Sequence, residues 1–242
     1  MRSTVLILLA FGLFVSADVL DKVASQAQDT LSKATSSETV RQCTCEEQHE
    51  CVTELEGHGL QCVDSCWSKF NKVTKHPEQL RECFHQSSVT IGSLIGCFED
   101  EATTCTKEKN DKQIPKVDIK KLLGVAAQKL LNAEKNVSSL LSGDVKEVLD
   151  TLTEFGTCVK GCLEEKNSGG FCFDKKGCQP LLDSKEEAKK AAKKCTRQVN
   201  FKQHASEVCE CAKKAGVANL DKLCPLVKAG SEAAQDAVKG SN

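Results

Sequence analysis

The stretch CVDSC, from Cys62 to Cys66, places two cysteines four residues apart, and the stretch CVKGC repeats this spacing from Cys158 to Cys162. In a helix, residues i and i+4 lie on one face, so both thiols of a pair point at the same neighbour. We therefore expect each pair to form two disulfides to adjacent helices, not one within the pair. This geometry predicts a stack of helices laced together by disulfides.

Residues 1–17 have the features of a secretory signal peptide. Arg2 supplies the positive charge, residues 5–15 form a short apolar run, and Ser16 and Ala17 are small residues at the expected cleavage site. The run is too short for a membrane span, and no later stretch approaches the roughly 18 apolar residues that a span requires. We expect a secreted, extracellular protein; the alternative is an N-terminal anchor helix that stays uncleaved.

Export favours disulfides, because no reducing system keeps thiols free outside the cell. The chain has sixteen cysteines, an even number. They form two sets of eight on either side of a cysteine-free centre, which predicts that each half, 43–105 and 158–224, closes its own bridges. All are expected to form disulfides: Cys43, Cys45, Cys51, Cys62, Cys66, Cys83, Cys97 and Cys105 in the first half, and Cys158, Cys162, Cys172, Cys178, Cys195, Cys209, Cys211 and Cys224 in the second.

The two halves share one cysteine spacing. The pattern C-x16-C-x13-C occurs over Cys66–Cys97 and again over Cys178–Cys209, although the flanking cysteines do not align. A diverged duplication and a coincidence among many cysteine gaps both explain this match.

Helix signals run through most of the chain. Residues 18–42 carry apolar side chains at helical spacing and predict an N-terminal helical segment. Pro77 is suited to the first position of a helix, and Ser184-x-x-Glu187 is a capping box. Residues 225–242 are small and polar and predict a flexible tail. The fold class is therefore all-α: a disulfide-rich helical bundle in which a helical hairpin joins two stapled halves.

The predicted hairpin covers the cysteine-free residues 106–157. Its apolar residues recur at alternating steps of four and three: Ile119, Leu123, Ala126, Leu130, Ala133, Val137 and Leu140. Ser142-Gly143 interrupts the pattern, and Asp144-x-x-Glu147 is a capping box that begins the second helix. We expect the apolar stripe to be buried in the core; the alternative is a groove for a lipid or a partner.

The composition excludes some functions. Lys plus Arg number 33 and Asp plus Glu number 34, so no overall positive charge attracts nucleic acid. The chain has one Trp and no Tyr, which disfavours a lectin-like site. No nucleotide-binding, EF-hand, zinc-protease or GxSxG pattern is present. We expect no catalytic residue, cofactor or metal, although a catalytic triad can assemble from distant residues.

The stretch CTCEEQHEC, residues 43–51, offers three cysteines and His49 as metal ligands. Oxidised cysteines cannot ligate zinc, and the usual pair of CxxC motifs is absent. The stretch also resembles the catalytic helix of secreted phospholipases A2. Here, however, Glu50 stands in place of the calcium-binding aspartate, and the glycine-rich calcium loop is missing. We expect all three cysteines here to form disulfides, with His49 and the glutamates facing water.

Three serine or asparagine positions are candidate glycan sites. Asn136-Val137-Ser138 is an N-glycosylation sequon. Ser142 and Ser168 each precede a glycine near acidic residues, as xylose acceptors for glycosaminoglycan chains do; alternatively, each glycine simply ends a helix. A basic stripe on one helix (Lys189, Lys190, Lys193, Lys194 and Arg197) offers contact with sulfated glycans or anionic lipid, or is simply a solvated face.

The Cys62-x3-Cys66 pair, the aromatic-containing helix Trp67–Val73, Cys83 and Cys97 together resemble a family of cysteine-rich secreted roundworm proteins that includes a chondroitin proteoglycan core protein. The stretch from Cys158 to Cys178-Gln179-Pro180 is similar too. The resemblance implies an extracellular, chain-bearing protein without catalysis.

We therefore expect a secreted, non-catalytic protein that binds an extracellular partner or builds extracellular material, as a matrix component or proteoglycan core does. The alternatives are a carrier of lipids or small ligands, a secreted effector or protease inhibitor, and a phospholipase-like enzyme.

Overall fold

The computed structural model describes residues 25, 28–101, 104–138, 144–182, 184–197, 199–218, 220–221, 224–225 and 228–229. Residues 28–34 are helical. The further helices are α3 (Cys45–Cys66), the 3-10 helix η1 (Trp67–Lys72), α4 (Pro77–Glu101), α5 (Ile119–Ser138), α6 (Asp144–Lys166), α7 (Cys172–Lys176), α8 (Lys185–Thr196) and α9 (Phe201–Lys214). The strands are β1 (Thr35–Gln42), β2 (Gln113–Val117) and β3 (Cys178–Gln179).

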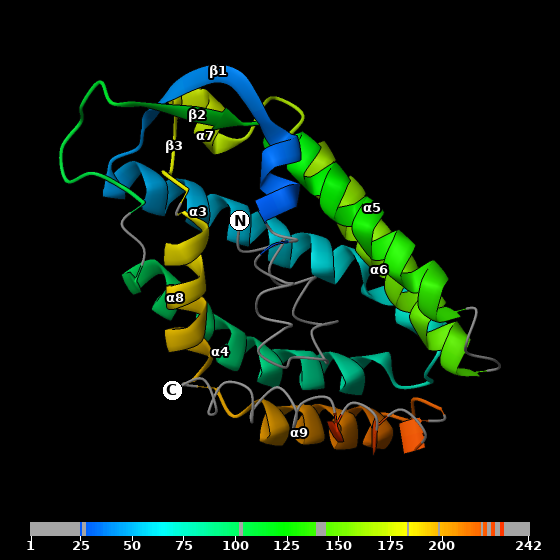
Figure 1. The fold of residues 1–242 in the computed structure, drawn as a ribbon. Helices are drawn as coiled ribbons and strands as arrows, with labels where there is room; N and C mark the ends of the chain where they lie inside the picture. The colour runs from blue at the N-terminus through cyan, green and yellow to red at the C-terminus, as the bar shows by residue number, and fades with distance from the viewer. Residues whose placement is uncertain are drawn as a thin grey trace.

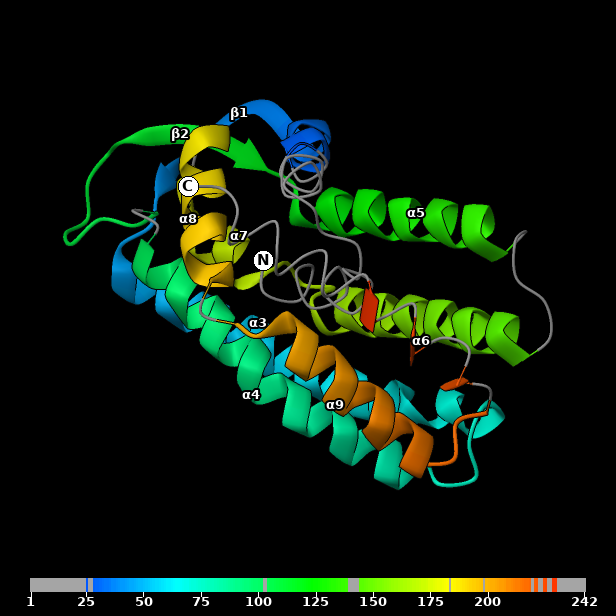
Figure 2. The same cartoon turned by 60° about the horizontal axis from the view of Figure 1, so that its bottom comes forward.

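The helices pack in two groups, which Figures 1 and 2 show from two sides. In the first group, α6 packs against both α5 and α3, and α7 packs on α3. In the second group, α4 packs against α8 and α9. The short helix η1 contacts α3, α4 and α6, and so joins the groups. Each group combines helices from both cysteine sets, so the two halves of the chain are interleaved.

Local signals in the sequence explain several helix ends. As predicted, α4 begins at Pro77, and α8 begins after Ser184, whose capping box with Glu187 is complete. After α9, Gly216 has a φ of 78°, a left-handed conformation that glycine adopts without strain. The predicted interruption at Ser142-Gly143 lies outside the described residues, and the chain from Asp144 to Lys166 forms α6, which covers the start of the predicted second helix.

A small sheet at one end of the molecule was not expected from the sequence. Residues 35–42 form β1, so the prediction of one helical segment over 18–42 is wrong for this part. The sheet order is β2-β1-β3, with β1 antiparallel to β2 and parallel to β3. The buried side chain of Gln179 binds the backbone of Val117 twice: Nε2 donates to the carbonyl at 2.7 Å, and Oε1 accepts from the N–H at 2.8 Å.

All sixteen cysteines are paired. Each thiol of the two C-x3-C pairs bonds to a neighbouring helix, as predicted, and the neighbours are each other: Cys62 bonds to Cys162 and Cys66 to Cys158, across α3 and α6. The further pairs are Cys43–Cys178, Cys45–Cys105, Cys51–Cys172, Cys83–Cys211, Cys97–Cys195 and Cys209–Cys224.

The prediction that each half closes its own bridges is wrong. Only Cys45–Cys105 and Cys209–Cys224 lie within one half, and the other six disulfides join the first half to the second. These six span between 92 and 135 residues of sequence. In the chain-entropy model, closing a loop of about 100 residues stabilises the folded state by about 4–5 kcal/mol. The crosslinks therefore hold the halves in one unit.

The shared cysteine spacing does not correspond to a structural repeat. Cys66 ends the long helix α3, whereas Cys178 lies in the short strand β3. Cys83 and Cys97 lie on one helix, whereas Cys195 and Cys209 lie on two. This arrangement favours coincidence over duplication.

Half-cystines form much of the core. One buried cluster combines Cys43, Cys51, Cys172 and Cys178 with Phe173, and another combines Cys62 and Cys66 with Val159 and Leu163. In the predicted hairpin, α5 packs against α6, and Leu122 and Leu123 near the start of α5 are buried. Of the predicted stripe, Leu123 is therefore in the core as expected and Ile119 is partly buried.

Within the part of the chain that the structure describes, no helix is both long and apolar enough to cross a membrane. The predicted signal peptide, residues 1–17, and most of the predicted tail, 225–242, lie outside the described residues.

Candidate functional site

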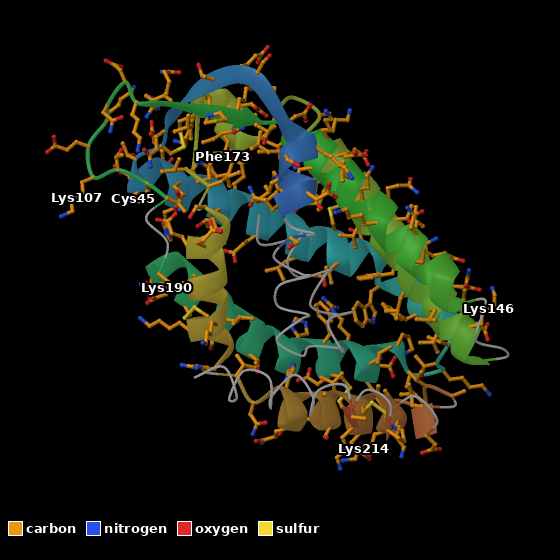
Figure 3. All side chains as sticks on the ribbon, in the orientation of Figure 1. Cys45, Lys107, Lys146, Phe173, Lys190 and Lys214 are labelled. Carbon is orange, nitrogen blue, oxygen red and sulfur yellow. A yellow bond between two sulfur atoms is a disulfide. The ribbon has the colours of Figure 1, made fainter. Side chains whose placement is uncertain are left out.

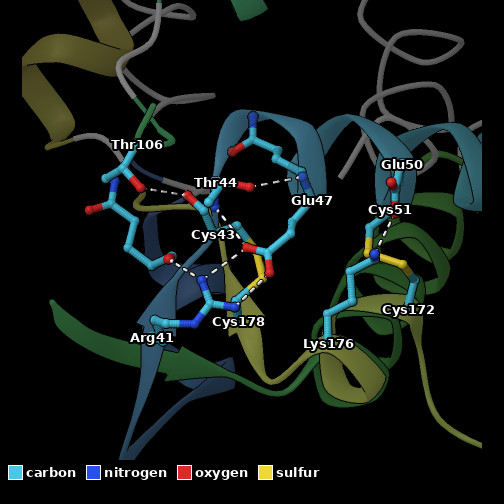
Figure 4. The surroundings of a disulfide bond; sticks show 12 residues. Arg41, Cys43, Thr44, Glu47, Glu50, Cys51, Thr106, Cys172, Lys176 and Cys178 are labelled. Atoms are coloured by element: carbon cyan, nitrogen blue, oxygen red, sulfur yellow. Dashed lines mark hydrogen bonds and ion pairs between the residues drawn. A yellow bond between two sulfur atoms is a disulfide. The ribbon is translucent and has the colours of Figure 1, made fainter. Parts of the chain in front are cut away.

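The N-terminal end of α3 is where the sheet, two segments of the second half and the 104–106 segment meet (Figure 4). We call this region the α3 junction and define it as residues 41–51, 104–106 and 172–179. Three disulfides anchor it: Cys43–Cys178, Cys45–Cys105 and Cys51–Cys172. It contains the whole of the stretch CTCEEQHEC.

Thr44 and Glu47 form a complete capping box at the start of α3. The backbone N–H of Glu47 donates to Thr44 Oγ1 at 3.2 Å, and the backbone N–H of Thr44 donates to Glu47 Oε2 at 2.9 Å. This arrangement satisfies N–H groups that the first helical turn leaves without partners. The pattern Thr-x-x-Glu is present in the sequence, so it could have identified Glu47 as a structural residue.

Glu47 also forms a bidentate ion pair with Arg41 at the end of β1 (Figure 4). Arg41 Nη1 donates to Glu47 Oε2 at 2.9 Å, and Nη2 donates to Oε1 at 2.8 Å. The side chains are only 12% and 22% exposed. Hydrogen bonds from Arg41 are the main reason that the pKa of Glu47 falls to about 2, and the pKa of Arg41 is raised in turn. The prediction that all three glutamates face water is therefore wrong for Glu47.

The α3 junction contains a possible metal-ligand set, but its atoms are already bonded. Cys43 Sγ, a Glu47 carboxylate oxygen and Cys178 Sγ all lie within 4.8 Å of one another. The two sulfur atoms are joined in a disulfide, and both carboxylate oxygens accept hydrogen bonds from Arg41. Neither sulfur is therefore a thiolate that could bind a metal ion.

His49 is exposed on the outer face of α3, as predicted. Its neighbour Glu50 forms an ion pair with Lys176 of α7 (Figure 4). A phospholipase-like site would require a carboxylate within hydrogen-bond distance of the His49 ring. Among the described residues, no hydrogen bond or ion pair joins the His49 ring to a carboxylate.

Four aromatic rings pack together where η1, α4 and α6 meet. Trp67 lies with its ring centroid 4.7 Å from Phe70, 5.5 Å from Phe84 and 5.7 Å from Phe155. Trp67 Nε1 donates to the carbonyl of Pro77 at 2.7 Å. The four rings contact one another, and the Pro77 carbonyl satisfies the indole N–H, so the cluster is part of the core.

The basic stripe predicted on α8 is partly neutralised. Lys194 forms an ion pair with Glu101 of α4, and Lys193 and Arg197 also have interaction partners. Lys190, labelled in Figure 3, is exposed. This arrangement favours a solvated face over a binding surface.

Of the three candidate glycan sites, only Ser168 has a side chain within the described part of the structure. Ser168 is exposed in the turn that follows α6, and its backbone N–H donates to Glu165 O at 3.1 Å. Asn136 lies near the end of α5, and the surroundings of its side chain are outside the described part. Ser142 also lies outside the described residues.

No protein-family model, curated protein or solved structure matches the chain. The similarity to the family of the chondroitin proteoglycan core protein thus stays a prediction from cysteine spacing and aromatic content.

Proposed function

We propose that the protein is a secreted, non-catalytic component of the extracellular environment that binds a partner or builds extracellular material. The observation that carries this proposal is the complete pairing of the sixteen cysteines, with six disulfides that cross between the halves. Dense disulfide frameworks persist where thiols are oxidised, as they are outside the cell.

The way the framework is built supports a mechanical role. Helices from distant parts of the chain are joined by covalent bonds as well as by side-chain packing, because α3 is bonded to α6 and α7, and α4 to α8 and α9. Such a protein keeps its shape where no chaperone can refold it. This property suits a scaffold that presents surface residues or attached chains.

Ser168 is the candidate attachment point for a glycosaminoglycan chain. It is exposed and precedes Gly169, and the acidic residues Glu164 and Glu165 come shortly before it in the sequence. In this proposal the disulfide-bonded helices are the core protein and the turn after α6 presents the acceptor hydroxyl.

The proposal is tested by mass spectrometry of the protein secreted from an animal cell line. The expected protein begins at Asp18, has no cysteine that alkylates before reduction, and gains sixteen alkyl groups after it. Protein retained in the cell, or thiols that alkylate without reduction, would contradict the secreted, fully oxidised protein.

A separate experiment tests whether the protein carries a glycosaminoglycan chain. Chondroitinase treatment should lower the mass of the secreted protein, and Ser168→Ala should abolish this change, with Ser65→Ala on the exposed side of α3 as the control. If the wild-type mass does not change, the attachment at Ser168 is wrong, whereas the secreted scaffold proposal is judged by the cysteine result alone.

A carrier of lipids or small ligands is the alternative from the sequence. The aromatic side chains between η1, α4 and α6 are candidates for lining a ligand site, but they contact one another directly. No observation on the described residues favours a carrier over the scaffold.

A further inference from the structure

The disulfides differ sharply in their exposure to solvent. All sixteen cysteines lie among the described residues, and Cys45 alone is exposed. Cys105, its partner, is half-buried. Each of the other seven disulfides contains at least one buried half-cystine. Cys45–Cys105 is therefore the one disulfide without a buried cysteine.

Exposure matters because a disulfide is opened by a thiolate that attacks one of its sulfur atoms, and this sulfur must be accessible. We propose that Cys45–Cys105 is the exchangeable disulfide of this protein, and that Cys45 is the site at which a small external thiol of the glutathione type becomes covalently attached.

The exchange reaction is balanced without a further oxidant or reductant. The thiolate of the small thiol forms a bond with Cys45 Sγ while the bond between Cys45 and Cys105 breaks. The electron pair of the broken bond stays on Cys105 Sγ, which leaves as a thiolate. One disulfide replaces another, and one thiolate replaces another.

The surrounding backbone keeps the site intact after this bond opens. The N–H of Cys45 donates to Thr106 O at 2.9 Å, and the N–H of Thr106 donates to Cys43 O at 3.0 Å. Thr104 O accepts from the N–H of Leu181 at 2.7 Å and from Gln42 Nε2 at 3.1 Å. The 104–106 segment is thus held on both sides, so opening is local and Cys105 stays close enough to reverse it.

The site also lies at the base of an exposed loop. Residues 107–112 begin two positions after Cys105 and are all exposed. They extend away from the helices toward β2 (Figure 1; Lys107 and Cys45 are labelled in Figure 3). Opening the disulfide removes the covalent anchor at one end of this loop.

The test exposes the folded protein to reduced glutathione at neutral pH, traps free thiols with N-ethylmaleimide, and maps the peptides without reduction. The first product should carry glutathione on Cys45 and maleimide on Cys105, with the other fourteen cysteines unmodified. Earlier opening of another pair, opening of all pairs together, or glutathione mainly on Cys105 would overturn the proposal.

Two variants, each with both cysteines of one disulfide replaced by serine, distinguish selective opening of Cys45–Cys105 from a general reactivity of all the disulfides. Cys45→Ser/Cys105→Ser should lose the first product, so that labelling of the remaining pairs is at least tenfold slower than the first wild-type step. Cys209→Ser/Cys224→Ser removes the other disulfide that lies within one half and should keep the first product at the wild-type rate. If the first variant does not fold, the order in which the disulfides of the wild-type protein open still tests the proposal.

Discussion

Arg41 and Glu47 form a two-point ion pair across the end of β1 and the first turn of α3, with nitrogen–oxygen distances of 2.9 and 2.8 Å. Glu47 also closes the capping box with Thr44. One carboxylate therefore fixes the start of α3 and its angle to the sheet. The Arg41–Glu47 ion pair lies beside the Cys43–Cys178 disulfide, so an ion pair and a covalent bond together hold β1, β3 and the start of α3.

Replacing Glu47 by Gln should destabilise the protein by about 1–2 kcal/mol, because Gln keeps the capping geometry but loses the charge-assisted bonds to Arg41. Guanidinium unfolding with the disulfides intact measures this. Glu46→Gln, on the exposed side of the same helical turn, is the matched control and should change stability by less than about 0.5 kcal/mol. Equal effects of the two substitutions would contradict a special role for Glu47.

The Glu47 contribution should depend on pH. Its pKa is about 2 in the folded protein, against an ordinary value of 4.5. Because folding lowers this pKa, the stabilisation is complete above the unfolded value and is lost as the pH falls from about 4.5 toward 2. The stability gap between wild type and Glu47→Gln should therefore narrow over this interval. Denaturant curves at several pH values check this, and a constant gap down to pH 2.5 would refute it.

Limited trypsin digestion tests the disulfides that cross between the halves. Lys107, Lys109 and Lys112 are exposed in an irregular loop, whereas many other lysines lie on helices. The first cut should fall in this loop, between the two cysteine sets. On a non-reducing gel the nicked protein should run as one band, and reduction should release two fragments. Release of the fragments without reduction would mean that each half closes its own bridges.

Trp67, the only tryptophan of the chain, is 8% exposed and anchors the aromatic cluster. Trp67→Ala should cost about 3–5 kcal/mol, because it removes a large buried ring. Trp67→Phe keeps most of the packing and loses the hydrogen bond to Pro77, so about 1 kcal/mol is expected. Unfolding followed by circular dichroism compares both with wild type. A loss below 1 kcal/mol for Trp67→Ala would contradict the core assignment.

Short-range sequence signals predicted the helical parts well. Pro77 and the Ser184 capping box begin helices because these residues act on their own first turn. The sheet was missed because β1 and β2 pair residues as far apart as Thr35 and Val117, and neither strand has a strong period-two pattern. The sequence pattern places Glu47 in solvent because nothing in it indicates the strand that carries its partner Arg41.

The sequence by itself determined that the described chain is helical and rich in disulfides, and that each C-x3-C pair reaches outward from one helix face. Helix periodicity and the residue spacing within one turn are local properties. Only the tertiary structure decided which cysteines meet. A disulfide requires Cα atoms about 4.4–6.8 Å apart, and here cysteines separated by 135 residues lie at 4.9 Å because β1 and β3 share a sheet.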